Sequence, residues 1–168
     1  MPVVGGNAID HNALYAGMVT SMQLTNGVSK LNSTGATIAF GAGVVSSGDE
    51  GMQLPSNSST ALDFVGIVKY ELNRAYQDGE TFGAPDNRDA TVVTHGEVAV
   101  LPQVDVTKDD PFYLIIGDGT LPNANLGRFS NVVGAGVTAA VLIADAKWTT
   151  TTTTASAQPG KISLGIGG

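Results

Sequence analysis

The segment TVVTHGEVAVL at residues 91–101 is the part of the sequence that decides the fold class. It is rich in β-branched residues, and Val92, Val98 and Val100 are spaced by even numbers of residues, which is typical of one face of a β-strand. Gly96 interrupts the run, and a glycine inside a strand pattern predicts a bulge or a tight hairpin. The segment therefore predicts extended backbone with a local irregularity near its centre.

Similar short apolar runs lie on both sides of this segment, and turn residues separate them. They are residues 18–25, 37–40 (TIAF), 63–72 (DFVGIVKYEL), 112–116, 137–148 and 161–166 (KISLGI). Asn26-Gly27 follows the first run and predicts a hairpin turn. The six threonines Thr149–Thr154 predict an edge strand or an extended surface loop, because β-branched residues favour extended backbone. Eight to ten short strands, with turns about every ten residues and no helical stripe, predict an all-β antiparallel barrel or sandwich.

Residues 1–16 differ from the rest of the chain. Proline, glycine and asparagine interrupt this stretch, so we predict an extended N-terminal arm over residues 1–16 and a single β-rich domain over residues 17–168. Disordered tails are normally poor in apolar residues, since such residues bury surface on a partner. The arm nevertheless carries five of them, and we expect these to contact a partner or a neighbouring subunit: Val3, Val4, Ile9, Leu14 and Tyr15.

The composition excludes several classes of protein. With 168 residues the chain has the length of one domain, and without cysteine it has no disulfide, thiolate metal site or cysteine nucleophile. The net charge is −7 and the eight basic residues are scattered singly, so we expect no nucleic-acid partner. The first residues lack the pattern of a secretory signal, and no apolar run approaches the roughly 20 residues of a membrane helix. We therefore expect no membrane partner and synthesis in the cytoplasm.

Catalytic patterns are missing as well. His11 and His95 are the two histidines and lack metal-ligand spacing, and no G-x-S-x-G nucleophile elbow is present. Acidic residues pair at Asp49-Glu50, Asp86 with Asp89, and Asp109-Asp110. Two carboxylates can serve a glycosidase, but these pairs lie in turn-like stretches, where aspartate caps its own backbone. We expect no enzymatic activity, no catalytic or metal-binding residues, and no cofactor.

The order of segments resembles the structural cement (capsid decoration) proteins of tailed bacteriophages. The matching pieces are residues 15–19, 37–41 with 43–45, 64–67, Tyr76 with Asp78-Gly79, 95–100, 109–114, 146–148 and 162–164. They span nearly the whole chain in order. The family usually has a Gly-Asp pair opening the strand near residue 109, where this chain has Asp109-Asp110-Pro111.

The resemblance implies a structural virion protein without catalytic residues. It would be a homotrimer on the outer surface of a phage head, between capsomers, and would hold neighbouring coat subunits against the pressure of packaged DNA. Its partners would be the major capsid protein and further copies of itself, and it would be made in the host cytoplasm. The five apolar arm residues would then contact the capsid or a neighbour.

An alternative function is a carbohydrate-binding or adhesin-type β-domain of a tail fibre or cell surface. Such a site needs exposed aromatic rings as sugar platforms, and the chain has one tryptophan, Trp148, and four tyrosines. Packing in the core or in an interface is the favoured interpretation of Trp148. A glycan array, or mixing the protein with expanded, undecorated capsids, would separate the two hypotheses.

Overall fold

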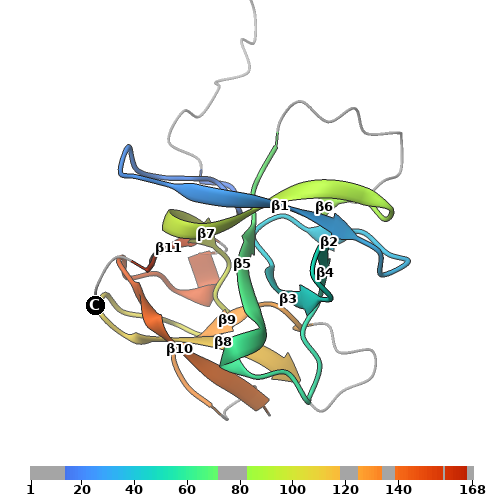
Figure 1. The fold of residues 1–168 in the computed structure, drawn as a ribbon. Coiled ribbons are helices and arrows are strands. Elements are labelled where there is room, and N and C mark those ends of the chain that lie inside the picture. Colours follow the sequence, from blue (N-terminus) through green and yellow to red (C-terminus); the bar gives the residue numbers. More distant parts are fainter. Residues whose placement is uncertain (1–13, 72–82, 118–124, 134–138, 157, 166–168) are drawn as a thin grey trace, which may run out of the picture.

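The computed structural model describes residues 14–71, 83–117, 125–133, 139–156 and 158–165, and this part of the chain is all-β (Figure 1). Its strands are β1 (Asn26–Asn32), β2 (Ile38–Ala39), β3 (Gly43–Ser47), β4 (Gly51–Gln53), β5 (Phe64–Val68), β6 (Gly83–Ala84), β7 (Arg88–Val100), β8 (Pro111–Gly117), β9 (Phe129–Ser130), β10 (Ala139–Trp148) and β11 (Gly160–Leu164). Two 3-10 helices join them, η1 (Ala61–Asp63) and η2 (Thr154–Ser156). The predicted all-β fold is confirmed. The described residues contain eleven strands, against the eight to ten predicted, and three of the eleven have only two residues each.

Five strands close into a small barrel. The ring runs β1-β4-β3-β5-β7, and β7 returns to pair with β1. Its pairs are antiparallel except β1–β4, which is parallel. The same sheet continues beyond β7 as β11-β10-β8-β9, below and to the left of the barrel in Figure 1. The chain is therefore a barrel with a four-stranded extension, which share the strand β7.

The long strand β7 is the segment from which the fold class was predicted. Its first half pairs with β1 up to His95, and its second half pairs with β11 from Gly96 to Val100. Gly96 lies at the change of partner with φ +123°, and a Cβ there would lie 2.8 Å from Thr25 Oγ1. The pairing register with β1 shifts beside it, since Asn26 lies opposite His95 and Gly27 opposite Val93. The predicted irregularity is thus a bulge within one continuous strand and not a hairpin.

The core forms two layers because the barrel strands bury both of their faces. Neighbouring residues of a strand point to opposite faces. Accordingly, Val92 and Val68 pack in one cluster, which is formed by barrel residues together with β2 and β6. Val93 and Ile67 pack in the other cluster, which also contains buried residues of β8 to β11 and therefore fills the space between the barrel and the extension.

Trp148 belongs to the second cluster and is fully buried, with its ring edge-on to Phe112 at a centroid distance of 5.6 Å. This confirms the prediction of a packing role. It also removes the one tryptophan from any sugar-binding platform. The indole Nε1 has no hydrogen-bond partner among the described residues.

The hairpin predicted at Asn26-Gly27 is wrong. Both residues begin β1, with Asn26 opposite His95 and Gly27 opposite Val93. The preceding run forms only a single bridge, Val19 to Val98, so no strand ends there for a hairpin to return. The glycine instead serves close packing, since a Cβ at Gly27 would lie 2.9 Å from Thr91 Cγ2.

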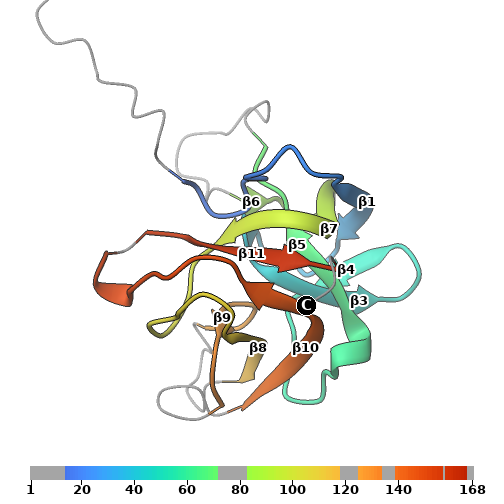
Figure 2. The same ribbon diagram turned by 90° about the vertical axis from the view of Figure 1, so that its left-hand side faces the viewer.

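The threonine run is an extended surface segment, as one of the two alternatives predicted. It follows β10, is bridged to the loop after β7 by Thr152 opposite Val106, and ends in η2 at the left of Figure 2. Within the described residues no helix is long and apolar enough to cross a bilayer.

Candidate interaction surface

Titratable side chains do not gather into a site in the described part of the chain. No group of three or more histidine, aspartate or glutamate residues there is placed to hold a metal ion. His95 is half-buried in β7, next to Gly165, and His11 lies outside the described residues.

Two aspartates of the acidic pairs, Asp110 and Asp86, accept hydrogen bonds from backbone N–H groups of loops. Asp110 Oδ2 accepts hydrogen bonds from the Thr107 backbone N–H at 2.8 Å and from Asn131 Nδ2 at 2.6 Å. These bonds, the first above all, hold the pKa of the Asp110 carboxyl below its ordinary value. Asp86 Oδ1 likewise accepts the Gly35 backbone N–H at 2.8 Å. The prediction of turn capping is confirmed at Asp110, whereas the Asp86 bond joins two loops that are far apart in the sequence.

Two glycines lock the end of the predicted N-terminal arm, which we call the arm base, onto the barrel. Gly17 has φ +85°, donates its N–H to Ala99 O at 2.7 Å and accepts the Tyr70 N–H at 2.9 Å. A Cβ at Gly17 would lie 2.6 Å from Val68 O, and one at Gly41 (φ +77°) would lie 2.7 Å from Gly17 N. Only glycine fits this close approach of two backbones, so the place where the chain enters the domain is fixed.

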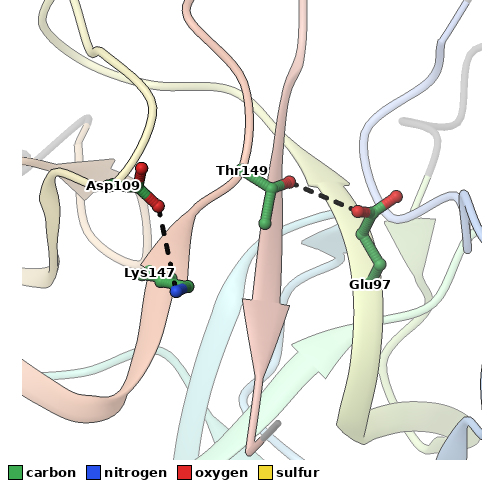
Figure 3. A network of polar contacts seen from close by, with 4 residues as sticks. All are labelled: Glu97, Asp109, Lys147 and Thr149. Atoms are coloured by element: carbon green, nitrogen blue, oxygen red, sulfur yellow. Dashed lines mark hydrogen bonds and ion pairs between the residues drawn. The ribbon is translucent and has the colours of Figure 1, made fainter. Parts of the chain in front are cut away.

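A side-chain network holds the next residues against β7. Figure 3 shows Glu97 of β7 with Thr149, whose hydroxyl donates to Glu97 Oε2 at 3.3 Å. The other carboxylate oxygen accepts the Thr20 hydroxyl at 2.5 Å. Glu97 therefore ties the incoming chain to the threonine run. The nearby pair of Lys147 and Asp109, 3.8 Å apart and partly exposed, contributes little by comparison.

An aromatic cleft opens directly beside the base of the arm. Tyr15 stacks on Tyr70 with centroids 5.5 Å apart and planes 12° from parallel, and Phe40 meets Tyr70 edge-on at 5.3 Å. These three rings and Ala16 line a cavity of about 280 Å³. Of the five predicted contact residues, Tyr15 thus forms a wall of this aromatic cleft and Leu14 lies beside it, half-buried. Val3, Val4 and Ile9 lie outside the described residues.

Exposed apolar side chains add a surface that the sequence reasoning missed. Met22 and Leu24 project from the loop between the arm base and β1, with relative exposures of 106% and 73%. Val28 and Leu31 of β1 are also partly exposed, at 39% and 38%. Elsewhere, Leu62 on η1 is 97% exposed. The sequence did carry one signal for this exposure, because Met22 and Leu24 are the two apolar residues in the otherwise polar stretch of residues 21–26.

Comparisons with known proteins agree with this picture of a structural protein with contact surfaces. Residues 6–165 match the profile of a family described as "Structural cement protein (E217 gp24/Pam3 gp6)". A similar solved structure is a chain of "The capsid of Myoviridae Phage XM1", with 22% identity, a TM-score of 0.71, and coverage of 97% of this chain and 98% of that one. No curated protein matches the chain.

Proposed function

Because the chain belongs to the phage structural cement protein family, it is a structural capsid decoration protein, and we propose that it binds the outer surface of a tailed-phage head between capsomers. The observation that carries this proposal is the family match over residues 6–165. Trp148 is buried and so cannot serve as an exposed ring in the carbohydrate-binding alternative.

The exposed apolar surface suits a protein that binds a large partner. Burying one large apolar side chain contributes about 1.5–3 kcal/mol. Met22 and Leu24 together would therefore contribute roughly 3–6 kcal/mol per subunit, which is weak binding for a single copy after the cost of association. Linking several copies raises the effective concentration of each further contact. An apolar surface of this size would therefore bind a partner tightly only when several copies act together in an oligomer.

We propose that this oligomer is a homotrimer, and the resemblance to decoration proteins is the main support for it. The covering of free strand edges supports it less, because the pairing of β1 with β7 closes the five barrel strands into a ring and the nine-stranded sheet ends at β9, a strand of two residues. Subunits would also cover apolar surface, and the low charge of the chain, 14% of residues, makes such surface inexpensive to desolvate.

The charge also fits an outer position on a DNA-filled head. Each chain carries −7, so three copies carry three times −7, or −21. An acidic exterior repels free nucleic acid, since binding to it depends on basic groups that release phosphate counterions.

Adding the purified protein to expanded, undecorated heads tests the proposal. Co-sedimentation at saturable stoichiometry, with density on the outside of the shell between capsomers, is the expected result. Failure to bind heads under conditions where the protein is folded would overturn it. Light scattering of the free protein measures the trimer separately.

A further inference from the structure

The first half of β1 has a free edge, because the barrel ring closes only at the far end of this strand. β1 pairs with β7 from Asn26 to Asn32, but β4 pairs with it only at Leu31 and Asn32. The chain turns at residues 48–50 before β4 begins, so the start of β1 extends beyond the turn between β3 and β4 (Figure 1). Within the described part of the chain, no strand pairs with residues 26–30 on this side.

The pairing register identifies the backbone groups that this edge leaves unpaired. Successive residues of an antiparallel strand direct their N–H and C=O groups alternately to one neighbour and to the other. The Leu31 N–H donates to Glu50 O at 2.9 Å, so Leu31 faces the side of β4 and away from β7. Ser29 and Gly27 face the same way by alternation, and both are exposed. Their outward N–H and C=O groups have no strand beside them among the described residues.

This edge lacks the residues by which natural proteins protect free strand edges. Charged residues, especially lysine, and proline prevent such an edge from pairing with another chain. Residues 21–29 (SMQLTNGVS) contain neither a charged residue nor a proline. The next residue, Lys30, is turned toward the neighbouring turn, since its Nζ donates to Asp49 O at 2.5 Å. The edge is therefore open to the addition of a strand.

A hollow lies on the face of this edge where Gly27 lacks a side chain. It has a volume of about 260 Å³, and its lining includes Gly27, Thr91 and Lys69. A Cβ at Gly27 would point toward Thr91, so this glycine faces the hollow. Residues directly opposite each other on paired strands have side chains on the same face. A side chain opposite Gly27 would thus lie at the hollow, and main-chain hydrogen bonds would combine with one side-chain pocket.

A second copy of this chain is a poor source of the added strand. A three-fold ring joins two different surfaces of each subunit, so β1 of one copy would have to meet another free edge of the next. The sheet ends at β9, where Phe129 O already accepts the Gln103 N–H at 2.8 Å beside Pro102, which has no N–H of its own. Pairing of β1 with β1 would be two-fold and would form dimers. A strand of another protein fits the edge better.

We propose that the edge of β1 at Gly27 and Ser29 binds an extended segment of the coat protein, which adds to the barrel as a further strand with a large apolar side chain opposite Gly27. The inference rests on the proposed binding to phage heads and names the backbone groups that make the contact. Met22 and Leu24 directly precede this edge in the chain, so their exposed side chains and the added strand would belong to one interface.

Amide hydrogen exchange, resolved by residue, tests the pairing with expanded, undecorated heads as the probe. The Gly27 and Ser29 amides should exchange rapidly in the free protein and at least tenfold more slowly on heads. The amides of Val28 and Lys30, which face β7, are the internal control and should be slow in both states. Unchanged rates at Gly27 and Ser29 on decorated heads would overturn the proposal. Slow exchange already in the free oligomer would also overturn it, because a second copy would then occupy the edge.

Ser29→Pro provides a second test, because it removes the outward N–H while the ladder between β1 and β7 loses no bond. It should weaken head binding at least tenfold in co-sedimentation. Ser29→Ala keeps the N–H and should bind as the intact chain does. Trp148 fluorescence checks that both variants are folded, and the exchange rates of the intact chain decide if Ser29→Pro does not fold. Equal binding by the two folded variants would contradict strand addition.

The two proposals fail in different ways. If the folded, intact chain does not bind heads, the proposed function and this inference are both wrong. If it decorates heads without slowing the exchange of the Gly27 and Ser29 amides, strand addition alone is wrong.

Discussion

Gly17→Ala tests whether the base of the arm is locked as described. Alanine at φ +85° costs about 1–2 kcal/mol, because the left-handed region is unfavourable for residues with a Cβ. The new Cβ would also lie 2.6 Å from Val68 O and 2.8 Å from Tyr70 N, which are backbone atoms that cannot rotate away. Forced overpacking costs about 1–3 kcal/mol more. We therefore expect a total loss of about 2–5 kcal/mol in the free energy of unfolding.

Gly35→Ala is the matched control. Gly35 has nearly the same backbone conformation, φ +78°, but a Cβ there would have no atom within 4 Å. It should lose only the conformational part, about 1–2 kcal/mol. Urea unfolding followed by the fluorescence of Trp148, the only tryptophan, measures both variants. The difference between them isolates the close approach of the two backbones.

Equal destabilisation by the two substitutions would refute the locked arm base, because it would mean that Gly17 is not confined by the strand beside it. The lock also has a functional consequence. If it directs the arm and the segment with Met22 and Leu24, Gly17→Ala should lower head occupancy at temperatures where the domain is still folded, and Gly35→Ala should not.

Substitutions in the core, in a turn and on the surface test three further parts of the structure. Trp148→Ala should cost about 3–5 kcal/mol of unfolding free energy by chemical denaturation, and Trp148→Phe clearly less, since no hydrogen bond of the indole is lost among the described residues. The pKa of Asp110 is lower in the folded state, so its contribution to stability is present above its unfolded pKa and is lost as the pH falls through the folded pKa; Asp110→Asn should flatten that acid limb in thermal melts across pH. Met22→Ser with Leu24→Ser should weaken head binding at least tenfold by co-sedimentation while changing stability by no more than about 0.5 kcal/mol, and Gln23→Ser in the same loop should change neither.

The all-β class was predictable because it rests on local patterns. Alternating valines in β7 and turns at regular spacing require no knowledge of the partners of a strand. A bulge or a hairpin was predicted near Gly96, but the choice between them depends on β1 and β11, the partners of β7, which lie far from it along the chain. Asn26-Gly27 shows the limit of local signals. A dipeptide that commonly makes hairpins lies within β1 here, because β7 offers a longer pairing register.

The contact surface was predictable only in part. The apolar residues of the arm were visible in the sequence, and Tyr15 does line the aromatic cleft. The other walls come from Phe40 and Tyr70, which lie far along the chain and meet Tyr15 only through the packing of the glycines. Met22 and Leu24 were read as part of a strand pattern, and only the structure shows that neither side chain is covered. Exposure depends on the tertiary neighbours, which one sequence does not specify.

A protein that strengthens a phage head from outside should delay the loss of DNA from that head on heating. DNA-filled heads are therefore heated with and without the bound protein in the presence of an impermeant DNA dye. We predict that decorated heads release their DNA at a clearly higher temperature, and that the increase scales with occupancy. An unchanged release temperature at full occupancy would contradict the claim.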